Sequence, residues 1–213
     1  MYTPAKFKQG DLKRLHALMR EHDFALLFTQ TESGPQATHL PFLLDEARGP
    51  HGTLVAHMAR ANPHWKSFSA ETEALVVFQG PHAYISTSWY AAEELVPTWN
   101  YAAVHAYGVP KLIHDPDKLL PMVQALLDAH EAPISGRRDL APHRQRLLPE
   151  LKAIVGFEIE IARLEGKWKF NQNRTRADQQ GVVDALKDHA DPVRREVAAI
   201  MQAHLDAPPK ARA

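Results

Sequence analysis

The amino-acid sequence predicts a mainly β member of the α+β class, in which an antiparallel barrel carries helices at its ends and one helical crossover. About seven extended segments follow one another, and most are joined by short turns rich in glycine, proline or serine. No Gly-x-Gly-x-x-Gly or Walker-type loop follows any of these segments. The pattern therefore favours a closed antiparallel barrel over a doubly wound sheet.

The first third of the chain predicts one helix and then a hairpin. Asp11 is a suitable N-cap, and the residues expected to face the core recur at helical spacing: Leu12, Leu15 and Leu18. Residues 24–31 and 36–44 are typical of strands, and the Ser33-Gly34-Pro35 sequence between them predicts the turn.

The middle third is dominated by extended structure. A strand is expected over residues 74–78, broken at Gly80-Pro81 and resumed over residues 83–86. Alternation over residues 99–109 predicts a long strand. Helices are expected from Asp115-Pro116 and over residues 142–153.

The last third predicts a strand, a tail and two helices. Residues 154–165 alternate between apolar and acidic positions, and residues 167–174 form a basic, aromatic and amide-rich continuation. Amphipathic helices are expected over residues 178–189 and 192–205. We therefore predict a barrel domain over residues 1–175 and a C-terminal helical extension over residues 176–213.

The composition excludes several classes of function. The 25 basic residues balance the 25 acidic ones, so the whole molecule carries no strong attraction to nucleic acid or anionic lipid. The absence of cysteine excludes disulfides, thiolate catalysis and cysteine zinc sites. Because residues 1–10 lack a signal-peptide core and no segment has the apolar length of a membrane span, we expect a cytoplasmic protein without membrane association.

The strand over residues 52–60 ends in a turn with the chemistry of an anion site. Asn62-Pro63 is a helix start, because asparagine accepts from free backbone amides and proline suits the first helical position. Arg60 precedes this start and Lys66 lies one turn inside it, so two cations and several amides converge as a phosphate monoester requires. An ordinary capped turn with solvated charges explains the same residues.

Local patterns of metal sites and of nucleophilic catalysis are missing. The 13 histidines include no His-Glu-x-x-His pair, so no metal site is predicted. Ser86 and Ser88 lack a Gly-x-Ser-x-Gly elbow, and no catalytic residue is assigned.

Aromatic and amide side chains gather near the long strand and after the last one. A flat heteroaromatic ring needs an apolar face and a few hydrogen-bonding groups at its edge. A core cluster plus a polar surface loop accounts equally for these residues, which are Trp89, Thr98, Trp99, Asn100, Tyr101, Tyr107 and the Asn171-Gln172-Asn173-Arg174 stretch.

Several segments, in order along residues 1 to about 183, resemble one family: the PaiB-type FMN-binding negative transcriptional regulators, within the flavin-binding split-barrel group related to pyridoxamine phosphate oxidase. Thr87 stands where this family usually has proline, and Phe170-Asn171 where it usually has leucine and serine. The matching segments are residues 1–7, 39–42, 52–57, 60–65, 78–86, 88–90, 96–101, 104–105, 172–174, 178 and 181–182.

The resemblance implies a six-stranded antiparallel split barrel that forms a homodimer and binds FMN in grooves between the subunits. Carried over to this sequence, Arg60, Asn62 and Lys66 would hold the phosphate and His57 would line the pocket. The residues implied to reach the flavin from either subunit are Thr98, Asn100, Tyr101, Gln172 and Arg174.

The resemblance leaves three functions open. The family name implies a bacterial flavin-dependent regulator with a DNA or protein partner, although the basic residues at 137–152 are interspersed with acidic ones and predict no nucleic-acid stripe. The alternative is an FMN-dependent oxidoreductase acting on a small molecule, with His57 and Tyr101 as candidate proton donors. A barrel that no longer binds flavin is the third.

Overall fold

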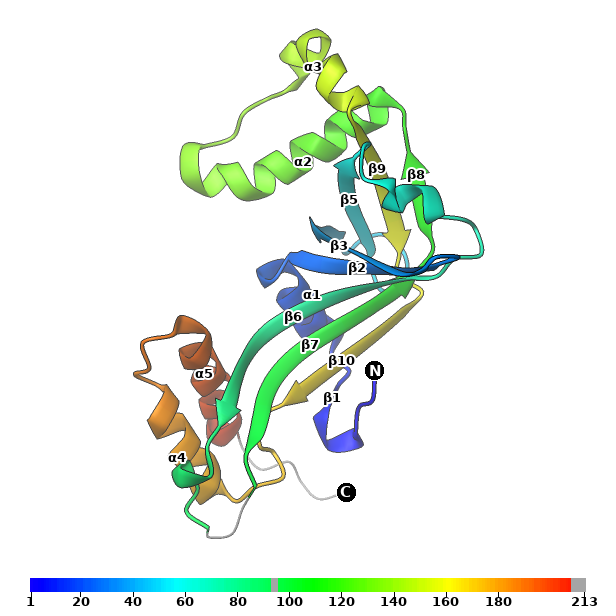
Figure 1. Ribbon diagram of the computed structural model, residues 1–213. Coiled ribbons are helices and arrows are strands. Elements are labelled where there is room, and N and C mark those ends of the chain that lie inside the picture. Colours follow the sequence, from blue (N-terminus) through cyan, green and yellow to red (C-terminus); the bar gives the residue numbers. More distant parts are fainter. Residues whose placement is uncertain (93–95, 208–213) are drawn as a thin grey trace. The chain divides into compact units, whose positions relative to one another are not determined.

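We describe the fold from a computed structural model of the chain, in which residues 1–92 and 96–207 are described. Antiparallel strands dominate, and the helices lie at the periphery (Figure 1). The strands are β1 (Lys8–Gln9), β2 (Phe24–Thr31), β3 (Gly34–Pro41), β4 (Leu43–Asp45), β5 (Thr53–Ala59), β6 (Ala74–Ile85), β7 (Thr98–Gly108), β8 (Pro110–Ile113), β9 (Ile154–Glu160) and β10 (Arg163–Lys169).

Most of the helical segments were expected from the sequence. The α-helices are α1 (Leu12–Glu21), α2 (Pro116–Ser135), α3 (Arg144–Lys152), α4 (Arg176–Leu186) and α5 (Pro192–Asp206). Short 3-10 turns are η1 (Ala5–Phe7), η2 (Pro63–Ser67), η3 (Thr87–Trp89) and η4 (Ala141–His143). None of the helices in the described ranges is both long enough and apolar enough to span a bilayer.

The strands form two sheets and not one closed barrel. The six-stranded sheet has the order β1-β10-β7-β6-β2-β3, and the four-stranded sheet has the order β4-β5-β9-β8. The closed barrel expected from strand count is therefore wrong for the described residues, whereas an open, split barrel is consistent with these orders. Strand number alone could not decide closure, because closure depends on which edges pair.

The chain divides into two compact units. The first unit comprises residues 1–11, 79–104 and 165–213, and the second comprises residues 12–78 and 105–164. The boundary between residues 175 and 176 that the sequence predicted stays a prediction.

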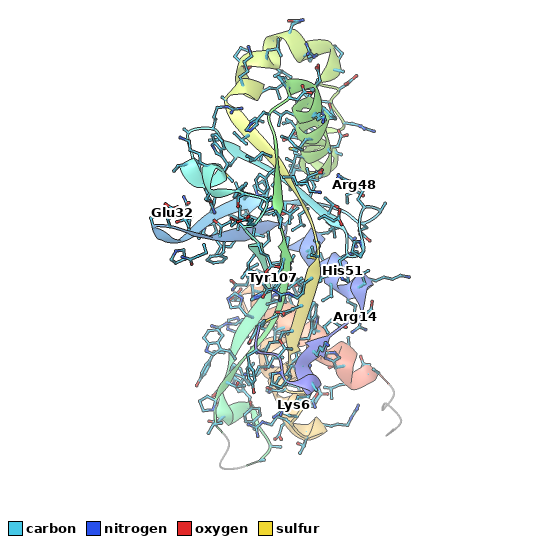
Figure 2. All side chains as sticks on the ribbon, turned by 90° about the vertical axis from the view of Figure 1, so that its right-hand side faces the viewer. Lys6, Arg14, Glu32, Arg48, His51 and Tyr107 are labelled. Carbon is cyan, nitrogen blue, oxygen red and sulfur yellow. The ribbon has the colours of Figure 1, made fainter. Side chains whose placement is uncertain are left out.

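In the second unit, the β2–β3 hairpin is tighter than expected. Thr31 pairs with Gly34 and Gln30 with Pro35, so Gly34 and Pro35 belong to the strand and only two residues form the turn. Glu32 lies at the tip of this hairpin (Figure 2). The predicted helix α1 buries Leu15 and Leu18, but Leu12 is 38% exposed, so its expected place in the core is wrong.

The four-stranded sheet of the second unit is covered by α2 on one face. Leu119, Met122 and Leu151 form a cluster against which Val55 packs. A Cβ atom on Gly156 would lie 2.5 Å from Leu119 Cδ2, so this glycine of β9 permits the close approach of α2. The other face of β5 is fully buried through Leu54, Ala56 and Met58, as its alternation predicts.

Strand β6 is continuous, which corrects the break expected at Gly80-Pro81. Its pairing with β2 covers Leu75 to Val77. Pro81 lies beyond this pairing, where the missing N–H removes no bond to β2, and proline is tolerated at such an edge position.

In the first unit, α4 and α5 lie against the strands. The helix α4 approaches η3 so closely that a Cβ atom on Gly181 would lie 2.0 Å from the Trp89 carbonyl oxygen. Met201 of α5 and Asn100 of β7 are fully buried and in contact. The single strand expected over residues 154–165 is wrong, because β9 ends at Glu160 and a separate strand, β10, begins at Arg163. Part of the expected tail belongs to β10, which extends to Lys169.

Candidate functional site

The turn after β5 has the cap that the sequence predicted. Asn62 Oδ1 accepts a hydrogen bond from the His64 backbone amide at 3.0 Å, and Pro63 occupies the first position of η2. The segment that follows is a five-residue 3-10 turn, which is shorter than an α-helix and carries no substantial macrodipole. Asn62 Nδ2 also lies 3.4 Å from Thr38 Oγ1. The cap therefore fixes the turn against the hairpin.

A histidine that the sequence did not single out anchors this turn. His64 is fully buried, with Nδ1 2.7 Å from Thr38 Oγ1 and Nε2 2.8 Å from Thr29 Oγ1. Burial lowers the pKa of His64, so the ring is neutral near pH 7, with one nitrogen donating to a hydroxyl and the other accepting. No local spacing could have revealed this role, because its two partners come from β2 and β3.

The two cations of the turn differ in whether their hydrogen-bond donors are occupied by the protein itself. Arg60 Nε donates to the Lys152 carbonyl and Nη2 donates to the Ile154 carbonyl, both at 2.7 Å. Lys66 is exposed, and its Nζ lies 5.8 Å from the centre of the Trp65 ring. Arg60 thus joins the turn to the start of β9, while Lys66 is accessible to a ligand.

His57 lies on β5 opposite Gly156 of β9. Its Nδ1 is buried and has no hydrogen-bond partner within the described ranges. Burial lowers the pKa of His57, which keeps the ring neutral near pH 7. A buried polar atom without a partner costs free energy and is the kind of feature that a ligand would satisfy.

The three predicted residues of β7 are distributed over both faces of the strand. Thr98 Oγ1 accepts a hydrogen bond from Lys169 Nζ. Asn100 is fully buried, where Nδ2 lies 3.3 Å from Met201 Sδ and Oδ1 has no partner among the described residues. Tyr101 points to the opposite face, with Lys167 Nζ 5.1 Å from its ring centre. Asn100 and Tyr101 therefore cannot contact the same side of one pocket.

The predicted residues after β10 stabilise a tight turn. Gln172 Oε1 accepts from the Phe170 amide at 2.8 Å, and its Nε2 donates to the Trp168 carbonyl at 2.7 Å. Asn171 adopts a positive φ of 59°, which asparagine tolerates better than most residues. Arg174 lies with its guanidinium carbon 5.5 Å from the centre of the Tyr90 ring. Gln172 is thus used by the turn, and Arg174 retains its guanidinium donors for a ligand.

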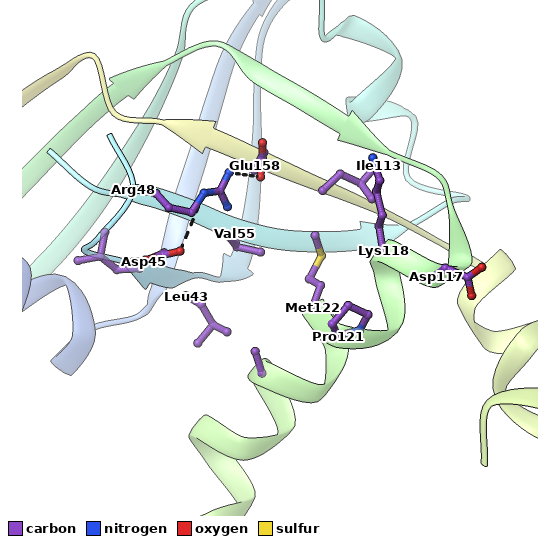
Figure 3. A pocket seen from close by; sticks show the side chains of 12 residues that line it. Leu43, Asp45, Arg48, Val55, Ile113, Asp117, Lys118, Pro121, Met122 and Glu158 are labelled. Atoms are coloured by element: carbon purple, nitrogen blue, oxygen red, sulfur yellow. Dashed lines mark hydrogen bonds and ion pairs between the residues drawn. The ribbon is translucent and has the colours of Figure 1, made fainter. Parts of the chain in front are cut away.

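The second unit also contains a groove between α2 and the four-stranded sheet, with a volume of about 770 Å³. None of the nine predicted site residues lines it. Leu43, Val55 and Met122 form part of its apolar lining, and Arg48 lies between Glu158, at 2.7 Å, and Asp45, at 4.0 Å (Figure 3). Because Asp45 and Glu158 already neutralise Arg48, its guanidinium group is not available to bind a phosphate group.

Comparison with known proteins identifies the family. The family model described as "Putative FMN-binding domain" matches residues 1–163. This chain belongs to that FMN-binding family. FMN is therefore its cofactor, as the resemblance found in the sequence also implied.

Relatives of this FMN-binding chain occur in bacteria and fungi. It is 36% identical to "Protease synthase and sporulation protein PAI 2" of Bacillus subtilis over 207 residues, covering 95% of this chain and 97% of that protein. It is 30% identical over 228 residues to the uncharacterized protein AN0679 of Emericella nidulans, covering 88% and 91% respectively. The resemblance to the PaiB-type proteins is thus confirmed, and the family is not restricted to bacteria.

Solved structures support the fold of this FMN-binding chain. The FAD and heme binding protein of Mycobacterium smegmatis aligns with a TM-score of 0.57 at 17% identity, covering 76% of this chain and 73% of that one. The flavocytochrome Anf3 of Azotobacter vinelandii aligns with a TM-score of 0.58 at 16% identity, covering 76% and 69%. The predicted split barrel with peripheral helices is confirmed as the fold class, with its sheets open.

The residues of the chain fit FMN in their chemistry. A flavin requires hydrogen-bonding groups at its ring edge and cations at its phosphate. His57 Nδ1 is buried without a partner in the described part of the chain, and Lys66 and Arg174 are cations with no ion pair there.

Proposed function

We propose that this chain is a flavin-dependent regulatory protein of the cytoplasm that works as a homodimer. The observation that carries this proposal is the 36% identity to PAI 2, which extends over 95% of the chain and is not confined to the flavin-binding part. Because the net charge is zero, we expect regulation to act through a protein partner or through a local DNA contact of limited strength.

The phosphate of FMN is assigned in this proposal to the turn after β5. Lys66 supplies an accessible ammonium, and Arg60 supplies positive charge while its bonds to the Lys152 and Ile154 carbonyls hold the turn in place. Asn62 fixes the entry to η2 through its cap. His57 lies on β5, the strand that leads into this turn, and is neutral near pH 7, so its Nδ1 can bond to the ligand.

The ring of FMN is assigned to side chains contributed by two protomers. Thr98, Tyr101 and Arg174 can present hydroxyl and guanidinium groups, because each is at least partly accessible. Asn100 and Gln172 act as positioning residues, since the first is buried against Met201 and the second holds the turn after β10. When bound, FMN supplies the one- and two-electron redox chemistry.

The first experiment tests the cofactor and its phosphate contact together. Purified protein is denatured, and the absorption spectrum of any released ligand is compared with that of FMN. Apo-protein is then titrated with FMN and with riboflavin, which lacks the phosphate. We expect Lys66→Ala and Arg60→Ala to weaken FMN binding about tenfold or more, and riboflavin binding much less. Equal losses for both ligands would refute the phosphate assignment, and size-exclusion with light scattering tests the homodimer.

An FMN-dependent oxidoreductase is the second candidate, favoured by Nδ1 of His57, which has no hydrogen-bond partner among the residues that the structure describes. A neutral imidazole with a free nitrogen can accept a proton during turnover, which a purely structural histidine does not need. Oxidation of NADH or NADPH faster than by free flavin would support this candidate. Retention of DNA that weakens with salt, without turnover, would support the regulator.

A further inference from the structure

Three lysines converge on one face of the sheet in the first unit. Lys8 of β1 pairs directly with Lys167 of β10, so their side chains project to the same face. Lys169 follows two residues after Lys167 on β10 and therefore lies on that face as well. The strands β1, β10 and β7 are neighbours in the six-stranded sheet (Figure 1). Like charges placed opposite one another destabilise a sheet, so this arrangement requires an explanation.

Lys167 is the most enclosed of the three, with only 8% of its surface exposed. Its Nζ donates to the Tyr2 carbonyl oxygen at 3.0 Å. The same nitrogen lies 5.7 Å from the centre of the Tyr2 ring and 5.1 Å from that of Tyr101. These contacts orient the ammonium through a carbonyl and two aromatic faces, but none of them neutralises its charge.

Lys169 is partly buried and donates from Nζ to Thr98 Oγ1. Its pKa is lowered, first by burial and then by the charge of Lys167. An ammonium has three N–H groups, so a single hydroxyl leaves Lys169 with donors for another acceptor.

Within the described ranges, no carboxylate forms an ion pair with Lys8, Lys167 or Lys169. Burying an ammonium without a counter-charge is costly, and the cost falls when an anion is bound beside it. We propose that Lys167 and Lys169, with Lys8 at the rim, form an oxyanion site for the carboxylate or phosphate group of a small ligand.

The neighbouring side chains indicate that this ligand carries a flat ring. Trp99 lies on the same face of β7 as Tyr101 and is 53% exposed. Its ring centre lies 6.0 Å from that of Tyr84, which is 43% exposed, and 6.3 Å from that of His82. Exposed aromatic faces next to cations suit a ring-bearing anion, because the ring stacks while the acid binds the lysines.

The lysines of this site belong to the first unit, whereas the turn to which we assigned the phosphate of FMN belongs to the second. Its ligand would be the substrate of the flavin in an oxidoreductase and an effector in a regulator. The oxyanion site itself does not depend on which of these functions is correct.

Inorganic phosphate is the probe for the oxyanion site. Apo-protein is titrated with phosphate by calorimetry at constant ionic strength, with chloride as the balancing ion. We expect saturable binding to the unmodified chain and a rise in Kd of at least about tenfold in Lys169→Met, because one charge-assisted contact is lost. Lys169→Arg should retain most of the affinity, and so should Lys111→Met, which removes an exposed lysine of β8 in the second unit.

The same variants are titrated with FMN and riboflavin to identify the source of the anion. Unchanged FMN affinity in Lys169→Met, together with the loss of phosphate binding, supports a site for a second ligand. A selective loss of FMN over riboflavin affinity would overturn the separation of the two sites. Phosphate binding that is absent from the unmodified chain, or equal in Lys169→Met and Lys111→Met, would overturn the oxyanion site. If the chain binds phosphate but no flavin, the proposed function fails while the oxyanion site stands.

Discussion

The turn after β5 and the lysines of β10 both gather positive charge, but the protein uses the two sets differently. In the turn, two nitrogens of Arg60 donate to main-chain carbonyls, and Asn62 and His64 complete the network. In β10, Lys167 and Lys169 each donate one hydrogen bond to the protein within the described ranges. The residue type of a cation therefore does not show how many of its hydrogen-bond donors are occupied by the protein itself.

The largest effect should follow from removing the histidine that holds the turn. His64→Ala deletes a fully buried ring and leaves Thr38 and Thr29 without their imidazole partner. We expect the free energy of unfolding to fall by about 3 kcal/mol, from lost packing and from unsatisfied hydroxyls. Urea unfolding of the apo-protein measures this loss.

The control for this experiment is His143→Ala, which removes an exposed histidine of η4. Its free energy of unfolding should change by less than about 0.5 kcal/mol. A His64→Ala variant as stable as this control would mean that the turn is held by Asn62 and Arg60 alone.

Arg60→Ala should have the next largest effect on the apo-protein. Loss of the two bonds to the Lys152 and Ile154 carbonyls should lower the free energy of unfolding by about 2 kcal/mol, since bonds from a charged donor exceed neutral ones. Lys66→Ala, which removes an exposed cation, should leave stability nearly unchanged. Equal stability of the two variants would show that the Arg60 donors are available to a ligand, as those of Lys167 and Lys169 are.

The sequence predicted more of the elements than of their contacts. The Asn62-Pro63 cap, the Asp115 cap of α2 and the alternation of β9 depend on neighbouring residues, and all were found. By contrast, the side chain of His64 meets β2 and β3, and Arg60 meets carbonyls 92 and 94 residues away. Such partners depend on strand order, which periodicity does not encode. For the same reason Pro81 looked like a break, although it lies within β6.

The stability of the turn should also depend on pH. Burial lowers the pKa of His64 below its unfolded value near 6.5, so the unfolded state takes up protons first as the pH falls. Its contribution is complete well above pH 6.5 and is lost as the pH falls through the folded pKa. Between pH 8 and pH 6 we expect His64 to contribute a loss of at most about 0.8 kcal/mol, and His57, whose pKa is also lowered by burial, to contribute a loss of the same sign. Urea midpoints at both pH values measure this loss of stability. If His64→Ala loses as much stability between pH 8 and pH 6 as the unmodified chain, the loss comes from other groups.

An effect of opposite sign is expected at Asn100, whose Oδ1 is buried without a partner in the described part of the chain. Asn100→Leu replaces this amide with an apolar side chain of similar reach against Met201, so we expect stability to rise by at most about 1 kcal/mol. Asn100→Asp, which buries a carboxylate at the same position, should instead be destabilising. If Asn100→Leu keeps its stability but loses FMN affinity, Asn100 contacts the flavin directly and is more than a positioning residue. Unchanged affinity would restrict the flavin contacts of β7 to Thr98 and Tyr101.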